Sequence, residues 1–131
     1  MTSPGGRVLC VEDDRDTSEM VSILLESFGY EVTVAETYAE ALRLAQSEEF
    51  DLYLLDIHLP DRSGLDLCRE LCQLTPHTPI AILSAAAYDT DRLAGIEAGA
   101  AIYLTKPIDI EALESTLKWL MEEGESSSIR F

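Results

Sequence analysis

Short apolar runs and longer amphipathic stretches alternate along this chain. Five of the apolar runs have the length of buried strands, at residues 7–12, 31–35, 51–56, 79–84 and 101–105. Between and after them, apolar side chains recur every three or four residues, which predicts helices. We place these helices at residues 18–28, 37–49, 89–98 and 109–122, with a further one that ends at Leu74.

Residues that favour turns and helix ends separate these segments. Gly29 and Gly99 follow two of the predicted helices, where glycine commonly caps a helix end. Thr37 precedes Glu40 by three residues, which is the spacing of an N-terminal capping box. Strands that alternate with helices pack as an α/β fold, so we expect a doubly wound parallel sheet with right-handed crossovers.

Length and composition fit a single domain. The chain has 131 residues, of which 47% are apolar, and this is enough for one core. No apolar run approaches the roughly 18 residues of a membrane span, and the first residues lack the pattern of a signal peptide. We therefore predict a soluble, cytoplasmic domain at residues 7–122, after a disordered segment 1–6 and before a polar tail or linker at 123–131.

The chain is strongly acidic, with 25 Asp and Glu against 9 Lys and Arg, and its formal charge is −16. Such a field repels nucleic acid and anionic membranes, so we expect neither as a direct partner. It suits a metal cation or a basic protein surface. The three cysteines, Cys10, Cys68 and Cys72, form neither a disulfide framework nor a zinc pattern, and we predict free thiols in a reducing compartment.

Polar residues gather where the predicted strands end. Glu12 and Asp13 follow the first strand, Asp56 closes the third, Ser84 closes the fourth, and Lys106 follows the fifth. Ligands of open parallel sheets bind beyond the carboxyl ends of the strands, at the point where the strand order reverses. We therefore expect three carboxylates, a hydroxyl and a lysine to meet at one edge of the sheet.

This set of residues suggests a particular chemistry. Carboxylates so close together repel one another, and a hard divalent cation such as Mg²⁺ relieves that repulsion. An aspartate can also act as a nucleophile on phosphorus. A lysine and the metal would then neutralise charge on the transferring phosphoryl group.

From Arg7 to Glu122 the chain resembles the receiver domain of bacterial two-component response regulators, as in chemotaxis response regulators. The matching motifs are Glu12-Asp13, Asp56 in LLDIHLPDRSG, Ser84 in ILSA, and Lys106-Pro107 in YLTKP. The resemblance implies a flavodoxin-like (βα)5 fold with strand order 2-1-3-4-5. It also implies that Asp56 is the phosphoacceptor, and that Mg²⁺ is bound by Asp56, by Asp13, by Glu12 directly or through water, and by the backbone carbonyl of His58.

The same resemblance assigns roles around the phosphoryl group. Ser84 and Lys106 would contact its oxygens, the Lys106–Pro107 bond would be cis, and Tyr103 would turn inward as an aromatic switch. The donor would be a sensor histidine kinase or a histidine phosphotransfer protein. Phosphorylation would change the surface from the fourth strand to the fifth helix, for an effector, an absent output domain or a homodimer. Apart from this self-phosphorylation and slow self-dephosphorylation, we expect no enzyme activity.

Two other classes of function remain open. A degenerate receiver would bind partners without being phosphorylated. A phosphohydrolase of the haloacid dehalogenase type would carry a second acid two residues after the nucleophile, where this chain has His58. Asp14 and Asp16 fit helix capping better than metal binding, and His58 and His77 are expected to face solvent rather than to bind metal through their rings.

Two further residues bear on the lifetime of the phosphoryl group and on partner binding. Ala86 lacks the polar side chain that helps position the attacking water in relatives that dephosphorylate quickly, so we expect a long-lived phosphoryl group. Trp119 lies opposite the apolar face of the last predicted helix, where it could cover the tail or contribute to a partner or dimer interface, and we favour the interface. That apolar face consists of Ile110, Leu113, Leu117, Leu120 and Met121.

Overall fold

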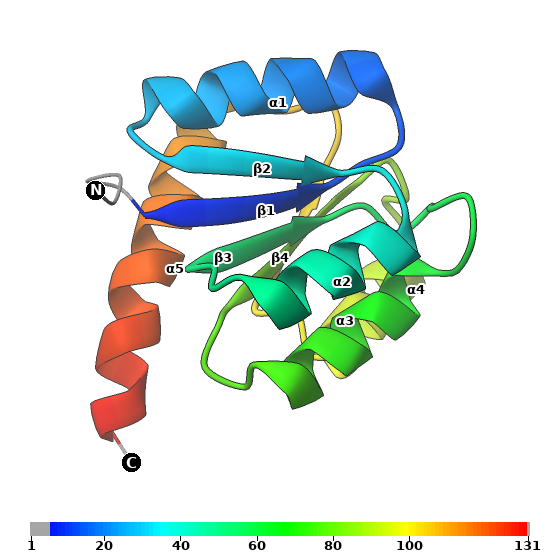
Figure 1. Ribbon diagram of the computed structural model, residues 1–131. Coiled ribbons are helices and arrows are strands. Elements are labelled where there is room, and N and C mark those ends of the chain that lie inside the picture. The colour runs from blue at the N-terminus through cyan, green and yellow to red at the C-terminus, as the bar shows by residue number, and fades with distance from the viewer. Residues whose placement is uncertain (1–5, 131) are drawn as a thin grey trace.

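The computed structural model describes residues 6–130 and has five strands and five helices within that range (Figure 1). The strands are β1 (Arg7–Val11), β2 (Glu31–Ala35), β3 (Leu52–Leu55), β4 (Ile80–Ser84) and β5 (Ile102–Thr105). The helices are α1 (Arg15–Ser27), α2 (Tyr38–Ser47), α3 (Gly64–Leu74), α4 (Asp89–Glu97) and α5 (Ile110–Arg130). Each element predicted from the sequence is present, although some ends differ.

The five strands are parallel and form one sheet in the order β2-β1-β3-β4-β5. This confirms the doubly wound, flavodoxin-like fold and its strand order. Strand β3 is buried throughout because helices cover both faces of the sheet, which explains its continuous apolar run. The strand order reverses between β1 and β3, so the carboxyl ends of these two strands flank the expected binding crevice.

Two apolar layers enclose the sheet, one on each face (Figure 1). On one face, α1 and α5 contribute buried leucines and a valine, among them Leu25, Leu113 and Leu117. On the other face, α2 and α3 pack through residues that include Tyr38 and Leu71. Because both faces are covered, polar chemistry is confined to the sheet edges and to the loops that follow the strands.

Helix α1 begins at Arg15, three residues before the start predicted at Ser18. Its first turn is polar, so the apolar periodicity that located the helix starts only in the second turn. The carboxylate of Asp14 caps this turn and accepts a 3.0 Å hydrogen bond from the backbone N–H of Thr17, which confirms its predicted capping role. Gly29 follows the helix at a φ of +100°, a conformation that glycine adopts without strain.

Helix α5 continues to Arg130, beyond the end predicted at Glu122. The residues there are mostly Glu and Ser, which a helix tolerates, and the single Gly124 costs only about 1 kcal/mol. Their use as a tail or linker stays a prediction. At the other end of the chain, the prediction for residues 1–5 lies outside the described residues, while the carbonyl of Gly6 already accepts from the N–H of Glu31. None of the helices in residues 6–130 has the length and apolar character needed to cross a membrane.

The apolar face predicted for α5 is largely correct. Leu113, Leu117 and Leu120 are buried, whereas Ile110, at the first position of the helix, is 52% exposed and does not belong to the core. Trp119 is 56% exposed, as its place opposite the core side predicts. Its role in an interface stays a prediction.

The three cysteines are free thiols, as the sequence predicts. Cys10 and Cys68 are buried and Cys72 is half-buried. Burial raises the pKa of both the Cys10 and the Cys68 thiols to about 12, because the charged thiolate would lose its hydration. These two thiols therefore behave as small apolar core groups.

Candidate phosphoacceptor and metal site

Backbone hydrogen bonds extend the sheet ladder one residue past β1, β3 and β5 and so position three of the site residues. The N–H of Glu12 donates to the carbonyl of Ala35 at 2.9 Å, and the N–H of Asp56 donates to that of Val11 at 3.0 Å. On the far side, the N–H of Lys106 donates to the carbonyl of Ser84 at 2.9 Å. The sheet therefore fixes the backbone from which the side chains of Glu12, Asp56 and Lys106 extend.

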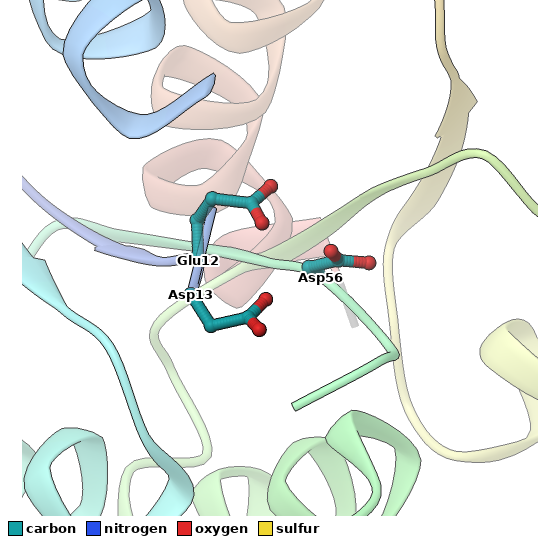
Figure 2. A group of neighbouring side chains, drawn as sticks. All are labelled: Glu12, Asp13 and Asp56. Carbon is teal, nitrogen blue, oxygen red and sulfur yellow. The ribbon is translucent and has the colours of Figure 1, made fainter. Parts of the chain in front are cut away.

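Three carboxylates meet at the ends of β1 and β3 (Figure 2). One oxygen from each of Glu12, Asp13 and Asp56 lies within 4.8 Å of the other two. Glu12 and Asp56 are 5% and 8% exposed, whereas Asp13 is exposed to solvent. The group could hold a metal ion that enters from the side of Asp13, since oxygen ligands of this kind suit hard cations.

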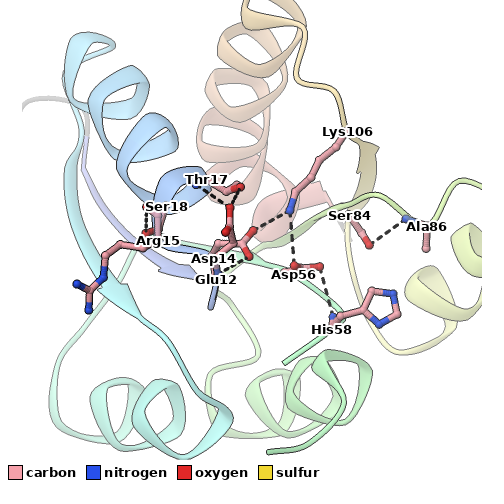
Figure 3. Close-up of polar contacts among 10 residues, drawn as sticks. All are labelled: Glu12, Asp14, Arg15, Thr17, Ser18, Asp56, His58, Ser84, Ala86 and Lys106. Atoms are coloured by element: carbon pink, nitrogen blue, oxygen red, sulfur yellow. Dashed lines mark hydrogen bonds and ion pairs between the residues drawn. The ribbon is translucent and has the colours of Figure 1, made fainter. Parts of the chain in front are cut away.

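Lys106 reaches between two of these carboxylates (Figure 3). Its Nζ lies 2.7 Å from Oε1 of Glu12 and 3.6 Å from Oδ2 of Asp56. Burial alone would lower the pKa of Lys106, but the hydrogen bond to Glu12 and the charge of Asp56 outweigh it and raise the pKa. Lys106 is therefore a full positive charge beside Asp56.

The pKa of Glu12 is raised as well, which for a carboxyl group disfavours the charged form. Burial raises its pKa, and the hydrogen bonds from Lys106 and from the N–H of Asp14 offset only part of that rise. The buried carboxylate depends on those partners to stay charged. The sequence predicted that Glu12 and Lys106 lie at the same edge of the sheet, but it did not predict the ion pair between them.

Ser84 and Tyr103 are connected through the backbone of Ala86. Ser84 is fully buried, and its Oγ accepts from the N–H of Ala86 at 3.2 Å. The hydroxyl of Tyr103 donates to the carbonyl of the same residue at 2.6 Å. Tyr103 is 5% exposed and its side chain is thus turned inward, the position that the switch prediction describes for one of its two states.

His58 lies two residues past Asp56, and its N–H donates to Oδ1 of Asp56 at 3.3 Å. Its side chain is exposed, as is that of His77, which confirms that both histidines face solvent. The use of the His58 carbonyl as a ligand stays a prediction. The Lys106–Pro107 peptide bond is cis, as the resemblance implies.

A profile of the response regulator receiver domain matches residues 8–118, which is most of the chain. The chain belongs to this family. Its receiver domain is 41% identical to a probable transcriptional regulatory protein of Picosynechococcus over 91% of this chain, and 36% identical to the response regulator MprA of Mycolicibacterium vanbaalenii over 95%. The alignments cover 50% and 57% of those proteins, so the chain spans about half the length of these curated relatives.

Solved receiver structures show the same fold. A CheY-like receiver domain protein of Methanospirillum hungatei superposes with a TM-score of 0.88 at 32% identity, covering 92% of this chain and 97% of that one. A response regulator of Burkholderia pseudomallei superposes with a TM-score of 0.80 at 31% identity, covering 93% and 72%. The latter structure contains a phosphorylated aspartic acid, a calcium ion and citrate.

Proposed function

We propose that this receiver domain accepts a phosphoryl group on Asp56, with Mg²⁺ bound beside it, from a phosphohistidine donor. One observation carries the proposal. The carboxylate of Asp56 has two other acidic oxygens within 4.8 Å and the ammonium of Lys106 at 3.6 Å. A nucleophile, a cation-binding group and a fixed positive charge therefore converge on one point, which is what phosphoryl transfer needs.

The residues divide the work of the transfer. An oxygen of the Asp56 carboxylate attacks phosphorus, the bond between phosphorus and the donor imidazole nitrogen breaks, and its electron pair stays on that nitrogen. Lys106 stands close enough to place its charge against the phosphoryl oxygens. Ser84, whose hydroxyl lies at the end of the adjacent strand, offers a hydrogen bond to the same group.

The donor set fits Mg²⁺. Glu12, Asp13 and Asp56 supply hard carboxylate oxygens, and Mg²⁺ in phosphoryl-transfer sites characteristically takes one or two carboxylates, waters and a phosphate oxygen. When bound, the ion neutralises charge on the phosphoryl group and orients it for attack. Asp13 and Asp56 would bind it directly, Glu12 directly or through water, and the carbonyl of His58 would complete the protein ligands.

Phosphorylation would switch the domain between two conformations. The hydroxyl of Ser84 would turn toward the phosphoryl group, and the inward position that Tyr103 already has would be stabilised by its bond to the Ala86 carbonyl. The surface of β4, α4, β5 and α5 would then favour an effector, an output domain or a second copy of the chain. A cytoplasmic sensor histidine kinase or phosphotransfer protein would supply the phosphoryl group, and the domain would catalyse only its own phosphorylation and slow dephosphorylation.

Intact mass after incubation with a small-molecule phosphodonor tests the proposal. We expect one added phosphoryl group on the wild-type chain with Mg²⁺ and none without it. Asp56→Asn should accept none under either condition, because the amide is not a nucleophile toward phosphorus. Asp51→Asn, an exposed acid at the opposite edge of the sheet, is the matched control and should be phosphorylated normally.

Absence of any addition to the wild-type chain would contradict the proposal and favour a receiver that binds its partner without phosphorylation. Addition that persists in Asp56→Asn would place the acceptor elsewhere. Addition without Mg²⁺ would reject the role given to Glu12 and Asp13.

A further inference from the structure

The loop between β3 and α3 carries both the phosphoacceptor and the predicted carbonyl ligand, and it is closed at its base. The N–H of Gly64 donates to the carbonyl of Ile57 at 2.7 Å, and a β-bridge joins His58 to Ser63. A β-carbon on Gly64 would lie 2.1 Å from the carbonyl oxygen of Asp56, so only glycine permits this approach. The base of the loop is thus set by the backbone.

The tip of the loop is held by a different part of the chain. The carboxylate of Asp61 accepts from the N–H of Tyr38 at 2.9 Å and from the N–H of Ala39 at 3.1 Å. These are the first two residues of α2, whose N–H groups have no partner within the helix. The next N–H, that of Glu40, is capped by the hydroxyl of Thr37 at 3.1 Å. Helix α2 therefore has its own cap and a second one supplied by the loop.

The neighbouring loop residue contacts the same helical residue. The guanidinium of Arg62 lies 4.1 Å from the ring centroid of Tyr38 and 4.0 Å from the carboxylate of Glu70 on α3. The Tyr38 hydroxyl donates to that carboxylate as well. Asp61 thus holds the backbone of Tyr38 while Arg62 covers its ring, and the loop tip is fixed between α2 and α3.

We propose that Asp61 is a positioning residue for the phosphorylation site. Asp61 contacts neither the acceptor nor the predicted metal ligands. It anchors the loop that also contains Asp56 and His58, which precede it by five and three residues. Release of the tip would let the backbone around His58 move, so its carbonyl and the Asp56 carboxylate would no longer be preorganised for an ion. This inference rests on the proposed function and adds a residue to it.

Cation affinity of the full chain tests the role of Asp61 without relying on activity. Binding of Mn²⁺, used as a probe for Mg²⁺, is followed by electron paramagnetic resonance of the free ion. We expect Asp61→Ala to weaken the affinity about tenfold, the lower end of the usual effect of losing a residue that orients metal ligands. Thr37→Ala is the matched control, since it removes a cap from the same helix end and leaves the loop tethered.

Both alanine variants should lower the urea midpoint of unfolding, because each leaves helical N–H groups without an acceptor. Only Asp61→Ala should weaken Mn²⁺ binding. Asp61→Asn keeps one carboxamide oxygen that can accept from α2, so its affinity should fall between wild type and Asp61→Ala. If Asp61→Ala does not fold, the Mn²⁺ affinity of Asp61→Asn relative to wild type tests the inference.

Equal Mn²⁺ affinities of wild type, Asp61→Asn and Asp61→Ala would overturn the inference and leave the proposed function intact. So would an equal loss in Thr37→Ala, which would assign the effect to α2 stability. A wild-type chain that binds no Mn²⁺ and takes no phosphoryl group would overturn the proposed function itself, and the role of Asp61 with it.

Discussion

The hydroxyl of Tyr103 and the carbonyl of Ala86 are joined by a 2.6 Å hydrogen bond. The N–H of Ala86 is at the same time 3.2 Å from the hydroxyl oxygen of Ser84. One peptide segment thus contacts both Ser84, at the proposed phosphorylation site, and Tyr103 of β5. If the Ser84 hydroxyl turned toward a phosphoryl group, its hydrogen bond from the Ala86 N–H would break. The bond from the Tyr103 hydroxyl to the Ala86 carbonyl would then still hold Tyr103 in place.

Tyr103→Phe removes the hydroxyl and keeps the ring. We expect the free energy of unfolding to fall by about 1 kcal/mol, because the half-buried carbonyl of Ala86 loses its donor. Urea denaturation measures the change. Tyr88→Phe is the control, since Tyr88 is exposed and its variant should stay within about 0.5 kcal/mol of wild type. Equal losses in both variants would show that the Tyr103 hydroxyl contributes nothing specific.

Gly95 of α4 leaves room for the inward ring of Tyr103. A β-carbon there would lie 2.7 Å from Cδ2 of Tyr103 and 3.0 Å from Cδ1 of Ile82. Gly95→Ala should therefore destabilise the domain, although alanine favours a helix interior by about 1 kcal/mol. In a Tyr103→Ala background the same change should cost less, because only the contact with Ile82 remains. Urea denaturation of the wild type and of the three variants measures this coupling, and additive effects would contradict it.

Lys106→Met should change two properties of the site in opposite directions. Loss of the positive charge beside Glu12 and Asp56 should tighten Mg²⁺ binding about tenfold, because the carboxylates then attract the cation without competition. Phosphorylation by a small-molecule donor should slow, because that charge no longer faces the phosphoryl oxygens. Lys118→Met makes the same change of net charge on exposed α5 and should alter neither. Weaker Mg²⁺ binding in Lys106→Met would contradict the argument.

Asp14 should contribute to the loss of stability in acid. Hydrogen bonds from the Thr17 hydroxyl and N–H lower its pKa in the folded state, whereas an unfolded Asp titrates near about 3.9. Its contribution is therefore complete above the unfolded pKa and is lost as the pH falls through the folded one. Asp14→Ser still caps α1 but does not titrate, so its urea midpoint should fall less steeply below about pH 4. Parallel curves for the two proteins would exclude this role.

The apolar pattern predicted the strands well for a physical reason. Residues such as Leu52–Leu55 are buried on both faces, so the whole strand must be apolar and stands out in the sequence. The beginning of α1 was not predictable in this way, because the residues of its first turn are polar and follow no apolar period. Helix ends depend on individual hydrogen bonds, and periodicity does not report them.

The same distinction applies to the site. Glu12, Asp56 and Lys106 could be brought together from the sequence because each follows a strand, and parallel strands end at one edge. The role of Asp61 could not, since its two partners are backbone N–H groups 22 and 23 residues away on α2. A single Asp in a polar loop gives no sign of which helix it caps, and only the packed fold supplies the partner.

Ala86→Glu should shorten the life of the phosphoryl group. The Ala86 backbone is already engaged by Ser84 and Tyr103, so the residue lies next to the proposed phosphorylation site while its methyl group offers no hydrogen bond. A carboxylate there can orient a water molecule for attack on phosphorus, which speeds hydrolysis of the aspartyl phosphate. Loss of phosphoryl mass from the isolated phosphorylated chain gives the rate. Ala86→Leu, which adds bulk without an acceptor, should not accelerate the decay; equal rates for wild type and Ala86→Glu would show that this position does not set the lifetime.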